Sequence, residues 1–176
     1  MTLPTFADVD AALAYFDSLP PVTIPQLLGR WRGAGVATGH PLDGLLETFG
    51  WHGKRFETAE DVHPLIFRSR GGRMFEVAPG RLPLTVLLRY PRTARLPLTA
   101  RLFTLARPLL TTSAPGARLR MTEYRGVVSA TMCYDALPVH DVFRRVDATT
   151  VLGAMDLRNS PQPLVFRLTR LGPPRS

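Results

Sequence analysis

The C-terminal third of the chain carries polar side chains inside segments that otherwise alternate apolar residues. They are Tyr124, Tyr134, His140, Asp141, Arg144 and Asp156. Residues two apart on a strand share a face, which groups Tyr134 with Met132 and Asp141 with Phe143. A buried polar atom without a partner costs about 1–3 kcal/mol, so such groups are paired or serve a ligand. If these faces line an interior, Tyr134 and Asp141 supply the few polar contacts typical of an apolar binding cavity.

A competing interpretation places the charged side chains on an outer face. There Asp141 and Asp156 would form cross-strand ion pairs with Arg144 and Arg145, each contributing about a few tenths of a kcal/mol. The residues alone leave both interpretations open.

Trp51 follows a predicted helix and lies beside His52 and Lys54. Near an opening, its indole could contact a ligand while its N–H stays hydrogen-bonded, although packing in the core is the alternative. The candidate ligand-binding residues are Trp51, Tyr124, Tyr134, Asp141, Phe143 and Met155.

The usual catalytic and metal-binding patterns are missing from the sequence. Adjacent strand residues face opposite sides, so His140 and Asp141 do not form an acid–base dyad by themselves. No G-x-S-x-G elbow occurs. The histidines lack the paired spacings of zinc or iron sites; they are His40, His52, His63 and His140. We therefore expect no catalytic residue, metal or cofactor.

Helical signals dominate the first 28 residues. Thr5 is a possible N-cap with Asp8 three residues later, and apolar residues follow at helical spacing until Pro20. Residues 24–28 predict a further short turn of helix.

The segment 29–37 predicts a strand with glycines where backbones approach closely. Residues 41–49 carry leucines and a phenylalanine at helical spacing and are followed by Gly50, which predicts an inserted helix able to cover an opening.

Strand patterns follow from residue 65 onward. Residues 65–70 and 73–77 flank Gly71 and Gly72 and predict a hairpin. The stretch 81–112 is rich in leucine, proline and arginine and predicts only strands with loops. Five strands then follow with tight turns between them: 117–125, 127–135, 138–146, 150–157 and 163–171. Such a meander favours a barrel or a sandwich, and closure of the sheet is the simplest way to remove exposed edges.

The chain has 176 residues, of which 45% are hydrophobic, and is long enough for one core. We expect a single domain over 1–176, with a helical segment 1–28, a segment 29–60 containing the inserted helix, and strands over 63–171. No apolar run approaches the roughly 20 residues that span a bilayer, and the start is acidic. These features predict a cytoplasmic protein without integral membrane insertion.

The net charge is +8, and Lys54 is the only lysine among the 22 basic residues. The arginines are spread along the chain and often alternate, as in Arg30 and Arg32, which is typical of solvated strand faces rather than of a phosphate-binding patch. We therefore expect no nucleic-acid partner.

The segment Gly29-Arg30-Trp31-Arg32-Gly33 resembles the bacterial GXWXG family, as do Thr38 to Asp43 and Gly50 to Phe56. The segments Met132 to Asp147 and Gly153 to Asp156 resemble the domain of unknown function usually joined to it. Gly29, Trp31 and Gly33 are then structural motif residues.

A further similarity is to lipocalin-like (calycin) barrels, whose first strand also opens with a Gly-x-Trp triplet. That similarity implies that Trp31 plugs the closed end beneath an arginine of the last strand, here Arg167 or Arg170. The expected fold is mainly β (α+β): an antiparallel calycin-like barrel with an N-terminal helix and a helix after the first strand.

The function expected from these features is noncatalytic binding of a small hydrophobic molecule, such as a fatty acyl chain, an isoprenoid or an aromatic metabolite. A rival is an isomerase or cyclase type of enzyme that uses Tyr134, Asp141 or His140 as acid or base, with Trp51 or Phe143 shaping the pocket. Haem binding by the histidines and a protein interaction module with arginine-rich faces are weaker alternatives. Nothing in the sequence decides the oligomeric state.

Overall fold

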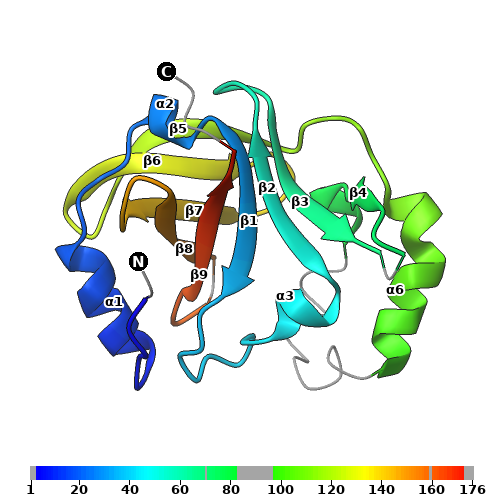
Figure 1. Ribbon diagram of the computed structural model, residues 1–176, viewed down its shortest axis with the longest axis horizontal. Helices are drawn as coiled ribbons and strands as arrows, with labels where there is room; N and C mark the ends of the chain where they lie inside the picture. The colour runs from blue at the N-terminus through cyan, green and yellow to red at the C-terminus, as the bar shows by residue number, and fades with distance from the viewer. Residues whose placement is uncertain (1–2, 70, 83–96, 159, 173–176) are drawn as a thin grey trace.

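Nine antiparallel strands form one sheet in the computed structural model, which describes residues 3–69, 71–82, 97–158 and 160–172. The strands are β1 (Gly29–Gly35), β2 (Trp51–Phe56), β3 (Val62–Arg68), β4 (Met74–Glu76), β5 (Ala117–Tyr124), β6 (Val127–Tyr134), β7 (Val139–Arg145), β8 (Thr150–Leu157) and β9 (Leu164–Leu171). Their order is β2-β1-β9-β8-β7-β6-β5-β3-β4. Because β2 also pairs with β3, the strands close into a ring with β4 attached outside it (Figure 1).

The predicted C-terminal meander is confirmed. Consecutive strands from β5 to β9 pair antiparallel, and β9 then pairs with β1. The hairpin around Gly71 and Gly72 is also confirmed, because β3 pairs with β4.

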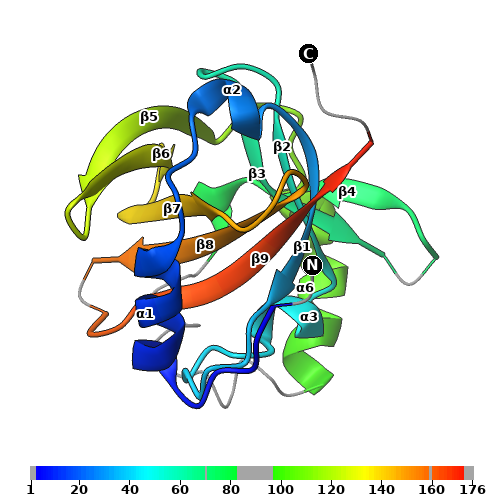
Figure 2. The same ribbon diagram turned by 60° about the vertical axis from the view of Figure 1, so that its left-hand side comes forward.

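The helices lie outside the ring or at its end. In the described part of the chain they are α1 (Val9–Ser18), α2 (Ile24–Leu27), α3 (Leu45–Thr48) and α6 (Pro97–Leu110), with a 3-10 turn over Pro79–Arg81. Figure 2 shows α1 beside β8 and β9, whereas α3 and α6 lie together away from it. No helix among the described residues is long and apolar enough to cross a membrane.

Two predicted helix boundaries are wrong. Helix α1 starts after Asp8, whose carboxylate accepts the Ala11 N–H at 2.8 Å, so Asp8 rather than Thr5 is the cap. The inserted helix is shorter than the predicted 41–49, because Gly44 has a φ of 77° and a left-handed residue cannot belong to a right-handed helix.

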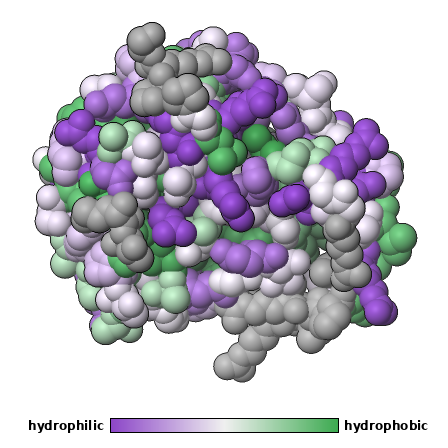
Figure 3. Space-filling view, in the orientation of Figure 1, coloured by the Kyte–Doolittle hydropathy of each residue, from purple (hydrophilic) through white to green (hydrophobic). Residues whose placement is uncertain are grey.

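The prediction of strands over 81–112 is also wrong where the structure describes it. Helix α6 occupies Pro97–Leu110, and its leucines recur at helical spacing, although Pro108 lies inside it. The part of the prediction on residues 83–96 lies outside the described residues. Leu98, Leu102, Leu105 and Leu109 are exposed, and hydrophobic side chains reach the surface at the right-hand edge of Figure 3, where Figure 1 draws α6.

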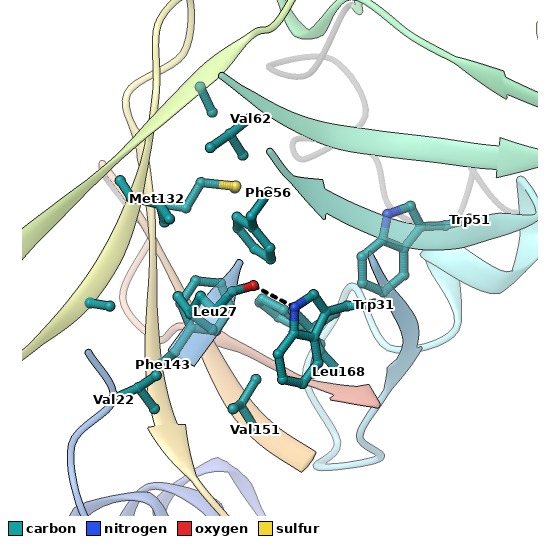
Figure 4. Close-up of a cluster of buried hydrophobic side chains, with 14 of the residues drawn as sticks. Val22, Leu27, Trp31, Trp51, Phe56, Val62, Met132, Phe143, Val151 and Leu168 are labelled. Atoms are coloured by element: carbon teal, nitrogen blue, oxygen red, sulfur yellow. Dashed lines mark hydrogen bonds between the residues drawn. The ribbon is translucent and has the colours of Figure 1, made fainter. Parts of the chain in front are cut away.

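Two hydrophobic clusters lie on opposite faces of the sheet. The inner cluster fills the ring and includes Trp31, Phe56 and Phe143 (Figure 4). Phe166 belongs to the same cluster. The outer cluster packs Phe16 of α1 against residues such as Leu152 and Val165. Alternation along each strand therefore divides its residues between the ring interior and the face covered by α1.

Candidate functional site

A cavity of about 380 Å³ opens among α3, α6 and the inner face of the strands. Its walls are almost entirely hydrophobic. They include Leu42, Leu45, Leu46 and Phe49 around α3, Trp51 and Phe67 on β2 and β3, Phe103, Ala106 and Leu110 on α6, and Val139, Met155, Leu164 and Phe166 on β7, β8 and β9. The volume falls within the range of about 300–1,000 Å³ typical of small-molecule sites.

Three polar side chains meet in the cavity wall. The Lys54 Nζ lies 2.8 Å from the Asp141 Oδ2 and 3.4 Å from the Tyr134 hydroxyl, to which it donates. It also donates to the Pro64 carbonyl oxygen at 3.3 Å. The Lys54 and Asp141 side chains are only 3% and 1% exposed. The pair is thus a buried ion pair on the surface of an apolar cavity.

The surroundings of Lys54 are aromatic. Its Nζ lies 5.4, 5.6 and 5.2 Å from the ring centroids of Trp51, Tyr134 and Phe166. Ring faces attract cations, and Trp51 and Phe166 hold each other edge-on with centroids 5.8 Å apart. The cation is therefore held by one carboxylate and a rigid set of rings.

Burial controls the protonation of the two acidic groups. It raises the pKa of Asp141, while the charge of Lys54 opposes that rise. It also raises the pKa of Tyr134 well above its usual value, with Asp141 adding to the effect. Tyr134 therefore stays a neutral phenol that can donate a hydrogen bond.

Two buried polar atoms at this site have no hydrogen-bond partner among the described residues. They are Asp141 Oδ1, an acceptor, and Trp51 Nε1, a donor. Both residues line the cavity. Buried polar atoms are normally paired, so this acceptor and this donor are candidates for contact with a bound molecule.

A β-bulge brings Lys54 to the cavity. Strict alternation from Trp51 would turn residue 54 to the opposite face, but the register of β2 against β3 shifts on both sides of Gly53. Gly53 has a φ of 150°, and a Cβ there would overlap the Trp31 carbonyl oxygen. The glycine permits the bulge, and Trp51 and Lys54 consequently both line the cavity.

The second glycine of the Gly29–Gly33 motif makes room for Trp51. A Cβ on Gly33 would overlap the six-membered ring of the Trp51 indole. Trp51 is 8% exposed, and its indole contacts the Phe166 ring as well as Gly33. Gly33 therefore sets the position of a cavity wall.

The tryptophan of the motif is part of the core and not of the cavity lining. Trp31 is 2% exposed, and its Nε1–H donates to the Leu27 carbonyl oxygen at 2.6 Å (Figure 4). The Arg170 guanidinium lies 4.2 Å from the ring centroid and donates to the carbonyl oxygens of Leu28 and Gln26. Of the two arginines expected at this place, the structure has Arg170.

The structure brings four of the six predicted ligand-binding residues to the cavity: Trp51, Tyr134, Asp141 and Met155. Phe143 is not a lining residue; it packs edge-on between Phe56 and Phe166 deeper in the core. Tyr124 does not belong to the site either. It packs edge-on against Phe16, because its position on β5 is opposite in alternation to the inward-facing Leu119.

The outer-face interpretation of Asp141 is wrong, since this carboxylate points inward to Lys54. Arg144 is fully buried but on the α1 side, with its guanidinium 5.0 Å from the Phe16 ring centroid. His140, the alternative acid or base, is exposed on that same face of β7. Sequence reasoning missed Lys54, whose one available signal was its being the single lysine of the chain.

Comparisons with known proteins identify the family of this chain. Residues 14–72 match the model of the GXWXG protein family, and residues 115–170 match a domain of unknown function, DUF4334. A crystal structure of a protein from Thermomonospora curvata is 33% identical, with a TM-score of 0.70 over 94% of this chain and 88% of that one. The chain belongs to the GXWXG family. No curated protein matches it. In this GXWXG protein, the first matched segment holds Trp51 and Lys54, and the second holds Tyr134, Asp141 and Met155, so the cavity joins both segments.

Proposed function

We propose that this protein is a calycin-like barrel that binds a small hydrophobic molecule in the cavity beneath α3 and α6. The observation that carries the proposal is an apolar cavity of about 380 Å³ whose lining residues include Asp141 and Trp51, with an acceptor, Asp141 Oδ1, and a donor, Trp51 Nε1, that have no hydrogen-bond partner in the described part of the chain. The apolar walls would hold the body of the ligand, and the polar groups would fix one end. The closed ring of strands and the Arg170–Trp31 contact support the comparison with calycins.

The charges of Lys54 and Asp141 disfavour a charged ligand. Lys54 and Asp141 already neutralise each other, so a ligand carboxylate would place a second negative charge beside one ammonium in a buried site. A hydroxyl or carbonyl group adds no charge. It could donate to Asp141 or accept from Trp51. We therefore propose a ligand with a neutral polar end, such as an alcohol, aldehyde, ketone or ester of isoprenoid, acyl or aromatic type.

The test is native mass spectrometry of freshly purified protein, followed by solvent extraction and identification of what is released. We expect a bound neutral lipid-like molecule, or binding of added citronellol with a higher melting temperature. Ala106→Trp would fill the cavity from α6 and abolish binding. Leu105→Trp, on the exposed side of the same helix, is the matched control and should bind normally. Binding that is equal in both variants, or absent from the unmodified protein, would contradict the proposal.

A second candidate is an enzyme that performs acid–base chemistry on the same ligand. It is favoured by the convergence of Tyr134 and Asp141 on Lys54 within 3.4 Å, which puts a neutral phenol beside a carboxylate. Asp141→Asn would then abolish conversion of the ligand. Incubating the extracted ligand with the protein, and analysing it for an isomer or cyclised product, separates this candidate from simple binding.

A further inference from the structure

Lys54 is the one aliphatic amine that the side chains of this protein provide. The chain uses arginine for the other 21 of its 22 basic residues. Arginine also forms the ion pairs at the surface, as in Arg120 with Glu60 and Arg125 with Asp17. The cation in the cavity wall is the exception.

The difference between these two side chains is chemical. A guanidinium cannot lose its proton in a protein and is a poor nucleophile, whereas a lysine in an apolar site can become a neutral, nucleophilic amine. A buried ion pair also adds little to the stability of a fold, because replacing both partners with hydrophobic residues of similar volume often leaves the stability unchanged or raises it. A lysine in an apolar cavity wall, beside its own proton acceptor, is therefore suited to covalent chemistry.

We propose that Lys54 forms an imine with the carbonyl carbon of an apolar aldehyde or ketone that enters the cavity. This rests on the proposed binding function and names the substrate class of that site. The cavity supplies hydrophobic walls for the body of the molecule, and Lys54 supplies the amine at its polar end. The Trp51 Nε1–H and the Tyr134 O–H, whose oxygen accepts from Lys54, would donate to the carbonyl oxygen.

The reaction balances without any further reactant. Asp141 accepts a proton from the Lys54 ammonium at 2.8 Å, and the neutral amine attacks the carbonyl carbon. The carbonyl oxygen takes up two protons in turn and leaves as water, with Asp141 relaying protons from the nitrogen. The products are one water and a protonated imine paired with the Asp141 carboxylate. No electron is gained or lost.

The surroundings favour that product. The protonated imine keeps a positive charge at the nitrogen, which lies between 5.2 and 5.6 Å from the centroids of three aromatic rings and next to a carboxylate. Its single N–H has Asp141 as acceptor. The apolar walls limit the access of water, which would hydrolyse the imine.

The experiment uses the full chain and three aldehydes that differ in shape: decanal, citronellal and 3-phenylpropanal. Each is incubated with the protein and cyanoborohydride, which reduces an imine to a stable amine. We expect a mass increase equal to the aldehyde less one oxygen atom, and peptide mapping should place it at Lys54. Mapping also separates this adduct from one at the amino terminus. The corresponding alcohols, decanol, citronellol and 3-phenylpropanol, should compete and suppress the adduct.

Binding of the alcohols is measured in parallel by native mass spectrometry. Alcohols that bind while no aldehyde is fixed at Lys54 would overturn the imine and leave the proposed binding function standing. Failure of every alcohol and aldehyde to bind would overturn both. Lys54→Arg keeps a cation for Asp141 but has no primary amine, and it should lose the adduct. If that variant does not fold, the measurements on the unmodified protein decide the question.

Discussion

The indole of Trp51 lies directly against the Cα of Gly33, on the neighbouring strand of the ring. A side chain at residue 33 would occupy the same space as the six-membered ring. One glycine of the motif that marks the family therefore holds a wall of the cavity formed with residues far along the chain.

Replacing this glycine tests the relationship. Gly33→Ala should destabilise the fold by about 1–3 kcal/mol, because overpacking a filled site forces the neighbouring ring to move. It should also weaken binding of citronellol, since Trp51 is displaced. Urea unfolding measures the first effect. Gly71→Ala is the control and should change neither property, because a Cβ at Gly71 meets nothing within 4 Å among the described residues.

The Lys54–Asp141 pair should behave as a coupled unit. Lys54→Met leaves a buried carboxylate without its cation and should lower the free energy of unfolding by about 3–5 kcal/mol. Adding Asp141→Leu to that variant should restore most of the loss. A double-mutant cycle from urea unfolding measures the coupling. Additive effects of the two changes would show that the pair does not interact.

The pair also predicts a pH dependence. The pKa of Asp141 is raised above its ordinary value of 3.8 by burial, and Lys54 opposes the rise, so Lys54→Met should raise it further. Between 3.8 and the folded-state pKa, the folded protein holds a proton that the unfolded chain has lost, so stability decreases as pH increases. We expect the Lys54→Met variant to gain stability on acidification through this interval, relative to the unmodified protein. Chemical unfolding at several pH values provides the measurement, with Lys54→Met/Asp141→Leu as the control that should lack this component.

Arg170 should stabilise the core through its contact with Trp31 of β1. Arg170→Lys keeps the charge but loses the planar stacking on Trp31 and part of the hydrogen bonding to Leu28 and Gln26. We expect a loss of about 1–2 kcal/mol in the free energy of unfolding, from the cation–π contact and the hydrogen bonds. Arg30→Lys, at an exposed position of β1, should change it by less than about 0.5 kcal/mol. Equal effects at both positions would argue against a specific role of the stacking.

Local sequence patterns predicted the strands whose apolar and polar residues alternate with a period of two. The five C-terminal strands follow from alternation and turn residues, and the start of the first strand at Gly29 follows from its glycines and Trp31. The same alternation correctly grouped Tyr134 with Met132 and Asp141 with Phe143, but only the structure shows that these faces point inward. Helix α6 was missed because its prolines and arginines obscured a leucine period of three and four residues.

The tertiary structure decided which strand faces line the cavity and which are covered by helix α1 or by other core side chains. Tyr124 and Phe143 were predicted correctly as strand residues, but one is covered by α1 and the other by neighbouring phenylalanines, which strand alternation does not encode. Lys54 is the clearest case. Period two along β2 turns it away from Trp51, and only the bulge at Gly53, set by pairing with β1 and β3, turns it inward to Asp141. The sequence by itself determined the first strand, the C-terminal strands and the polar residues they carry; the register between strands distant in sequence determined that a lysine, a carboxylate and a phenol share one cavity wall.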